Sequence, residues 1–263
     1  MNKLSIVFNF LLFILGIFFS SCEDEIQVEL RTAEPVLVIE GNVRMDSLAY
    51  VRITKTKGFA EDNTYLPVEG AMVKIWDDAG NYEILQLGDS GNYIANTIIG
   101  KEKVTYNLLV EYEGKEYTAM SYMPPRVAID SLSLFEFPVL DYPLPMIHFQ
   151  DPLGEENRYY RFLVYINGER PDISLQLLST EFMDGLVIHN MIGVYTDDDD
   201  DPIEQGDELL IEMQCVDKDV FLFWETLSRI DNSLTNPTSN IQGGALGYFS
   251  AYSFEQSNIL AVW

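Results

Sequence analysis

The feature that most constrains the fold is a series of short runs in which apolar and polar residues alternate, separated by turn sequences. Residues 50–55 and 104–112 alternate in this way, and residues 77–80 and 88–91 carry the Asp and Gly of tight turns. Alternation with a period of two places apolar side chains on one face of a β-strand. About seven such strands at near-regular spacing predict a β-sandwich over residues 36–123.

A second β-rich domain is expected over residues 124–263. It follows the sequence Met123-Pro124-Pro125-Arg126, whose prolines favour extended backbone and mark a break between segments. Strand patterns then recur, which makes the predicted fold class mainly β throughout. The expected strands of this domain cover residues 131–137, 146–150, 159–166, 175–178, 186–189 and 208–216.

One short α-helix is predicted at about residues 218–230. Asp217 is a residue type that caps helix N-termini, because its carboxylate can accept backbone N–H groups. Val220, Phe223, Trp224 and Leu227 follow at i, i+3, i+4 and i+7, which gives the helix one apolar face. We interpret these aromatic side chains as core packing against a sheet, in preference to a ligand site.

The front of the chain resembles a bacterial lipoprotein signal peptide over residues 1–21. Lys3 precedes an apolar run at residues 4–19, and the small residues Ser20 and Ser21 come directly before Cys22. The run is shorter than the roughly 20 apolar residues that a spanning helix needs. We therefore expect cleavage before Cys22 and lipidation of its thiol, with an uncleaved anchor helix as the alternative.

Residues 22–35 are expected to form an acidic tether. Glu23, Asp24 and Glu25 directly after the lipidated cysteine resemble the surface-export signal of Bacteroidota lipoproteins, and a solvated linker is the alternative. The expected location is the outer membrane, with a lipid anchor at the cell surface. The periplasmic face of that membrane is the second option.

Charge and cysteine content narrow the class of function. The formal net charge is −26, and it becomes −27 when Lys3 is removed with the signal peptide. Such acidity argues against nucleic acid as a partner, because the phosphates would be repelled. Cys215 is the only cysteine besides Cys22, so no intramolecular disulfide is expected once Cys22 is lipidated. It lies in an apolar run, where we expect a buried small side chain and not a nucleophile.

The first domain resembles the carboxypeptidase-regulatory or transthyretin-like sandwich. The resemblance rests on residues 67–80, with Gly70 at a tight turn, Val73 and Ile75 facing the core and Gly80 at a hairpin, and then on Gly91-Asn92-Tyr93. Gly70 permits a tight entry into the strand, and Gly80 supplies the positive φ that a hairpin turn needs. The resemblance implies a spacer or docking module and no catalytic residues.

Five motifs that follow the lipoprotein signal in chain order carry a second resemblance, which covers nearly the whole chain after Cys22. They are Val38-Ile39-Glu40-Gly41, residues 67–71, Phe149-Gln150-Asp151-Pro152, Tyr159-Tyr160-Arg161-Phe162 and Asn240-Ile241-x-Gly243-Gly244-x-x-Gly247-Tyr248-Phe249. Together they resemble a Bacteroidota family of lipoproteins of unknown function (domain-of-unknown-function family 4249), whose members are often encoded beside TonB-dependent outer-membrane receptors. The resemblance implies an accessory role at such a receptor, and it implies no catalytic residues.

The residues offer little catalytic chemistry. The run Asp197, Asp198, Asp199, Asp200 and Asp201 could hold Ca²⁺, but it lacks the ligand spacing of an EF-hand, and a solvated loop is the favoured interpretation. With only His148 and His189 and no pair of cysteines, a zinc site is not expected. No Gly-x-Ser-x-Gly sequence is present. We therefore expect no enzyme and no resident cofactor.

Some of the aromatic residues could bind a ligand. Tyr142, Tyr248 and Tyr252 are candidates for a platform on which a sugar or peptide stacks, although most aromatic side chains should lie in the core. Three functions follow from the sequence. The favoured one is a non-enzymatic accessory or docking subunit of a TonB-dependent nutrient receptor. The alternatives are a stand-alone module that captures glycan, peptide or calcium, and an unrecognised hydrolase.

Overall fold

The computed structural model describes residues 34–57, 66–136, 138, 140–153, 159–171, 175–194, 202–230 and 235–263. Among the described residues, strands make up 55% and helices 7%, with several sheets and a single short α-helix, which confirms the mainly β prediction. Cys22, the acidic residues Glu23, Asp24 and Glu25, and the run Asp197–Asp201 lie outside the described residues. The predictions made for them therefore stay predictions.

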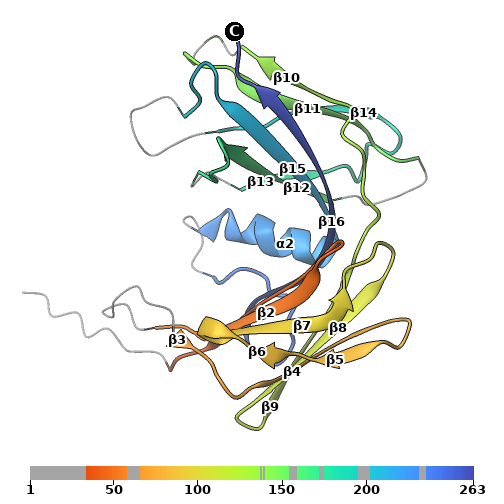
Figure 1. The fold of residues 1–263 in the computed structure, drawn as a ribbon, viewed down its shortest axis with the longest axis vertical. Coiled ribbons are helices and arrows are strands. Elements are labelled where there is room, and N and C mark those ends of the chain that lie inside the picture. Colours follow the sequence, from red (N-terminus) through yellow and green to blue (C-terminus); the bar gives the residue numbers. More distant parts are fainter. Residues whose placement is uncertain are drawn as a thin grey trace, which may run out of the picture. The chain divides into compact units, whose positions relative to one another are not determined.

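The largest sheet has nine strands in the order β13-β12-β15-β16-β1-β2-β7-β6, with β3 paired to β2 (Figure 1). It therefore contains strands from both halves of the sequence. Its strands are β1 (Leu37–Arg44), β2 (Leu48–Lys55), β3 (Leu66–Pro67), β6 (Gln86–Leu87), β7 (Asn92–Ile99), β12 (Tyr159–Ile166), β13 (Gln176–Ser179), β15 (Glu208–Val216) and β16 (Leu246–Leu260).

Two smaller sheets pack against the large one through two separate cores. The first has the order β5-β4-β8-β9 and the second β10-β11-β14. The first core includes Ile39, Val51, Val73 and Leu108, and the second includes Ile147, Phe149, Val164 and Ile211. The strands are β4 (Met72–Asp77), β5 (Tyr82–Ile84), β8 (Thr105–Tyr112), β9 (Lys115–Tyr122), β10 (Ser131–Phe135), β11 (Leu144–Gln150) and β14 (Val187–Met191); a short 3-10 helix, η1 (Asp89–Gly91), precedes β7.

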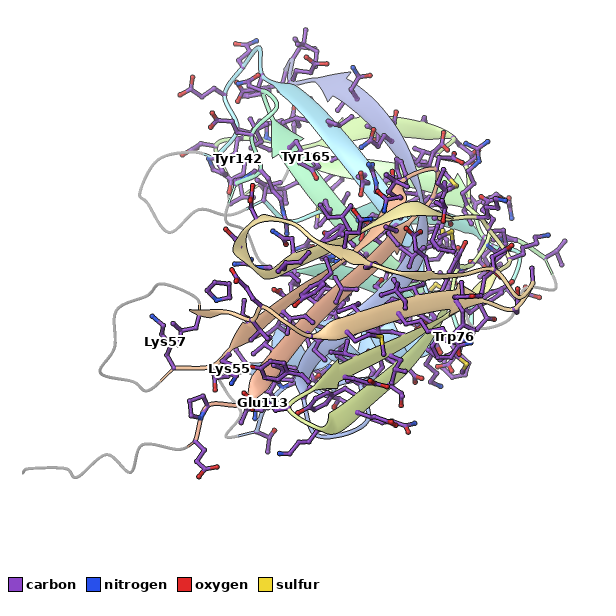
Figure 2. All side chains as sticks on the ribbon, turned by 60° about the horizontal axis from the view of Figure 1, so that its bottom comes forward. Lys55, Lys57, Trp76, Glu113, Tyr142 and Tyr165 are labelled. Atoms are coloured by element: carbon purple, nitrogen blue, oxygen red, sulfur yellow. The ribbon has the colours of Figure 1, made fainter. Side chains whose placement is uncertain are left out.

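The first core agrees with the alternation of apolar and polar residues in the sequence. Val73 and Ile75 are fully buried in the first core, as the alternation predicts. Gly70 and Gly80 have φ of 81° and 88°, so both turns use the backbone region that favours glycine. Lys55 at the end of β2 and Glu113 in the β8–β9 turn form an ion pair of 3.4 Å between the two sheets (Figure 2).

Strand β16 connects the two halves of the chain. Its first part pairs in parallel with β1, from Val38 opposite Leu246 to Arg44 opposite Tyr252, and its second part pairs antiparallel with β15. Residues after position 124 thus complete a sheet that residues before it begin. Whether residues 36–123 and 124–263 fold as separate domains stays a prediction.

The motif at residues 240–249 sets up this parallel pairing. Gly247 has φ of 98°, and a Cβ there would collide with the carbonyl oxygen of Ile39 on the neighbouring strand. A Cβ at Gly41 would lie 2.6 Å from the ring of Phe249, so that glycine leaves room for the aromatic side chain. The side chain of Asn240 donates to Phe249 O at 2.7 Å and accepts from Phe249 N at 2.9 Å. The motif is therefore accounted for by close packing at the start of β16.

The one α-helix among the described residues is α2 (Lys218–Leu227). Asp217 caps it by accepting the N–H of Val220 at 2.9 Å, as predicted. The helix ends three residues before the expected residue 230, where the backbone turns and the hydroxyl of Ser228 bonds to the carbonyl of Glu225 at 2.8 Å. In Figure 1 the helix lies beside β12, β13 and β16, and the contacts agree.

Candidate binding face

The two smaller sheets cover one face of the nine-stranded sheet, and α2 lies on the other, which we call the helix-bearing face. Side chains alternate along each strand, so the register fixes which residues share this face. Asn42 pairs with Tyr50 and Ser250, Arg44 pairs with Tyr252, and Arg161 pairs with Gln214. The shared face comprises Glu40, Arg44, Tyr50, Arg161, Glu212, Gln214, Tyr248, Tyr252 and Gln256.

Arg161 is the residue that β12 contributes to this face. Its guanidinium carbon is 3.7 Å from the ring centroid of Trp224, and its Nη1 donates to Gln214 Oε1 at 3.4 Å. Its Nε is buried and has no hydrogen-bond partner among the described residues. Burial lowers the pKa of Arg161 to about 10, so the side chain remains a cation at neutral pH. Such a cation stacked on an indole is held in place without a carboxylate.

Glu212 is a buried carboxylate beside this arginine, with 3% of its surface exposed. Arg44 Nη2 lies 3.1 Å from Oε2, and Gln256 Nε2 donates to the same oxygen at 2.7 Å. Gln214 Nε2 donates to Oε1 at 2.7 Å, so both oxygens have donors. Because Gln214 also accepts from Arg161, a polar network runs from β1 through β16 and β15 to β12.

Three tyrosines complete the face. The ring of Tyr248 lies 4.9 Å from Phe223 and 4.8 Å from Trp224, and its hydroxyl accepts from Asn42 at 3.5 Å. Burial raises the pKa of both Tyr248 and Tyr252, and it raises that of the more exposed Tyr50. All three therefore present neutral hydroxyl groups at physiological pH. The face combines arginine, stacked rings and hydroxyls, which suit a polar organic ligand better than a metal ion.

The structure separates the three tyrosines that the sequence suggested as a stacking platform. Tyr248 and Tyr252 share the helix-bearing face and contact the cluster around α2. Tyr142 is buried in the second core and donates its hydroxyl to Val194 O at 3.2 Å (Figure 2). The ring of Tyr248 already packs against the rings of Phe223 and Trp224. Any stacking by this group thus involves Tyr252 and Tyr50 more than Tyr142.

Sequence reasoning missed the charged members of this face. Arg161 lies within the apolar strand Tyr159–Ile166, and Glu212 within Glu208–Val216. A charge in the middle of an apolar strand is costly unless it has a partner, and that signal could have identified both residues. The sequence predicts core packing for Trp224, and the indole does pack between helix and sheet, but Arg161 also stacks on its ring.

The fold thus defines a protein of stacked β-sheets with one helix and with a buried arginine–glutamate network on the face of its largest sheet. The family model for the domain of unknown function DUF4249 matches residues 23–258, and the chain belongs to that family. No curated protein matches the chain. The matched range includes β1 and all but the last two residues of β16, so the Gly41–Phe249 contact and the Asn240 hydrogen bonds lie within the family domain of this chain.

Proposed function

We propose that this protein is a lipoprotein of a Bacteroidota-like outer membrane that acts, without catalysis, as an accessory or docking subunit of a TonB-dependent nutrient receptor. The front-end sequence supports the anchor, because Cys22 follows an apolar run and two serines. The observation that carries the docking role is an exposed apolar patch beside β14. The aromatic and aliphatic side chains of this patch are of the kind that protein interfaces bury.

The anchor would hold the domain close to the membrane. Burial of an acyl chain is worth about 0.8 kcal/mol per CH₂, and two or more chains give stable attachment. From Cys22 to Glu34 the chain can span at most ~40 Å. Among the described residues, the ten-residue α2 is the only α-helix, and no described helix has the length and apolarity of a bilayer span. Confinement to the membrane plane would raise the effective concentration near a membrane partner.

The exposed patch, which we call the corner patch, consists of Leu153, Phe182, Leu186 and Val187. Phe182 is 93% exposed and Leu153 is 84% exposed. The four residues belong to one corner, because Asp151 N donates to Leu186 O at 2.9 Å and Gln150 pairs with Val187. Large apolar side chains this exposed on a chain of charge −26 are typical of a surface that binds a protein partner.

A second function, ligand capture, is favoured by the helix-bearing face. Glu212 compensates the charge of Arg44, whereas Arg161 bonds to an amide and stacks on Trp224. A cation with aromatic rings and tyrosine hydroxyls around it suits a glycan or a peptide carboxylate. It does not suit calcium, which takes oxygen ligands from carboxylates and carbonyls. Of the three ligands considered for capture, this face therefore favours a glycan or a peptide over calcium.

The test of docking is a pull-down from the native bacterium in mild detergent, followed by mass spectrometry. The wild-type protein should retain an outer-membrane barrel receptor. The double variant Leu153→Ser/Phe182→Ser should lose it, and Ile84→Ser, which removes an exposed apolar side chain from β5, should keep it. Recovery of the wild-type protein without a receptor would count against docking.

The anchor and the ligand face have their own readouts. Cys22→Ser should move the protein from the membrane fraction to the soluble fraction, and an unchanged membrane fraction would contradict lipidation.

For capture, a shift in melting temperature with one glycan or one peptide should disappear in Tyr252→Ala. A receptor in the pull-down together with no shift for any ligand would favour docking alone.

A further inference from the structure

The two histidines of the chain meet on the outer face of the three-stranded sheet. His148 in β11 and His189 in β14 are register partners, and their Nδ1 atoms are 2.5 Å apart. The ring centroids are 4.8 Å apart with an angle of 67° between the rings. At this distance two bare lone pairs would repel, so the contact needs either a hydrogen carried by one Nδ1 and donated to the other, or a metal ion that both nitrogens bind. Either way the two Nδ1 atoms are directed at the same point.

Two methionines flank the histidines on the same face. Met146 and Met191 are also register partners, and each lies two residues from a histidine on its own strand. Side chains two apart share a face, and cross-strand partners have Cβ atoms about 5 Å apart. Ile147, between Met146 and His148, and Ile188, next to His189, are buried in the second core, so the side chains that alternate with them point outward. Two imidazoles and two thioethers therefore gather on one outer surface.

A second contact orients one of the imidazoles. His148 Nε2 lies 2.8 Å from Ser133 Oγ on β10. Histidines that ligate metals commonly use their other ring nitrogen as a donor to a neighbouring acceptor, and this fixes the ring. With Nε2–H donated to Ser133, Nδ1 of His148 presents its lone pair toward His189. Two nitrogens on one metal stand roughly 3 Å apart, so a small ring rotation admits the ion.

We propose that His148, His189, Met146 and Met191 form a binding site for copper(I). The chemistry of the donor set selects this metal, because thioethers are soft ligands that favour Cu(I) over Zn²⁺, Ca²⁺ and Mg²⁺. Within the part of the chain that the structure describes, no group of three or more His, Cys, Asp or Glu side chains is placed to hold a metal. The metal preference of this site is therefore set by its two thioether sulfurs.

The position of the site suggests how copper would reach it. His189 and Met191 are exposed, and His148 and Met146 are half-buried, so the ion would bind at the surface and not inside the core. The methionine side chains are unbranched and flexible, which lets them close over an ion that the histidines have bound. The site would thus capture and release copper. It does not depend on the lipid anchor or on the corner patch.

The test uses the full chain after residue 21 with Cys22→Ser, which removes the one thiol that could compete at the surface. Cu(I) is titrated under anaerobic conditions against a coloured Cu(I) chelator, with excess Ca²⁺ present to occupy weak carboxylate sites. The expected result is one Cu(I) per chain, with both nitrogen and sulfur neighbours in X-ray absorption. His148→Asn and the double variant Met146→Leu/Met191→Leu should each weaken binding by at least about tenfold.

Controls separate this site from adventitious binding. Met120→Leu changes a methionine on β9 that is 61% exposed, and it should leave Cu(I) affinity unchanged. Thermal unfolding of each variant checks that it is folded, which is expected because the altered side chains face outward. Three results would overturn the proposal. The first is a Cu(I) affinity in His148→Asn or in the double methionine variant that is as high as in Met120→Leu. The others are Zn²⁺ binding as tight as that of Cu(I), and one Cu(I) still bound per chain in His148→Asn.

Discussion

Two buried carboxylates in this protein have opposite surroundings. Glu212 on the helix-bearing face is 3% exposed, and Asp151 at the end of β11 is 1% exposed. Glu212 has the cation of Arg44 and two amide donors, so both oxygens are bonded. Asp151 Oδ1 accepts from the hydroxyls of Tyr160 and Thr180, whereas its buried Oδ2 has no hydrogen-bond partner within the described part of the chain.

The comparison shows that the depth at which a charged group is buried does not determine its contribution to the free energy of unfolding. Removing a carboxylate from water costs free energy that only good partners offset. Glu212 has an opposite charge, and its removal would leave a half-buried arginine and two amides without their acceptor. Among the residues that the structure describes, Asp151 has neutral donors on one oxygen only and no opposite charge. Replacing each carboxylate by the isosteric amide separates these two situations.

The largest effect is expected for Glu212→Gln. The amide cannot balance Arg44, and its NH₂ group would face the donors of Gln214 or Gln256. Breaking a buried ion pair costs about 3–5 kcal/mol of unfolding free energy, and the half-exposed Arg44 places the expected loss near the lower limit, about 3 kcal/mol. Urea unfolding at neutral pH measures it. A loss below 1 kcal/mol would mean that Arg44 is satisfied by solvent and that the network is not stabilising.

A third carboxylate sharpens the comparison, because it has many donors and little burial. Glu83 on β5 accepts from three backbone N–H groups and two side chains of residues 96–98 at the edge of β7. Desolvation alone would raise its pKa, but these hydrogen bonds outweigh it and lower the pKa to about 2. Glu83 therefore connects the two sheets of the first sandwich at this edge.

The expected loss for Glu83→Gln is about 1–2 kcal/mol, after the pKa shift is discounted for solvent screening. The folded-state pKa is depressed, so the stabilisation is complete above pH 4.5 and is lost as pH falls toward 2. Urea midpoints at pH 7, 4 and 2.5 measure this dependence for the wild type and the variant. The difference between them should shrink with acid, and a constant difference would show that Glu83 acts through shape and not through its charge.

Local patterns explain how much of this fold the sequence predicts. The alternation at β4 and the apolar face of α2 with its Asp217 cap are properties of adjacent residues, and the structure has both. The pairing of β16 with β1 joins residues such as Asn42 and Tyr248, which are 206 positions apart. A parallel pairing at that separation leaves no local signal.

The same reason explains the candidate sites. Tyr142 and Tyr248 look alike in sequence, but a single aromatic residue does not indicate which sheet will cover it. His148 and His189 seemed too few for a zinc site, and that interpretation considered neither the register of β11 with β14 nor the methionines. Register between strands that are distant in sequence therefore decides both the helix-bearing face and the proposed copper site.

The smallest effect is expected for Asp151→Asn, and it is the sharpest test of the comparison. The amide can keep its oxygen toward Tyr160 and Thr180, while an NH₂ group replaces the unpartnered Oδ2. The substitution removes a buried charge that has no opposite charge among the described residues, and this gain offsets the unbonded NH₂. The unfolding free energy should therefore change by less than about 1 kcal/mol.

Asp151→Ala provides the control for that result, because it leaves both hydroxyls without their acceptor and should cost about 1–3 kcal/mol. Urea unfolding at neutral pH measures the free energy of unfolding of the wild type, Asp151→Asn and Asp151→Ala. If Asp151→Asn destabilised the protein as much as Glu212→Gln, then Oδ2 would have a partner in solution, such as an ordered water molecule or a bound cation. Both buried carboxylates would then be fully satisfied, and the difference between their surroundings would disappear.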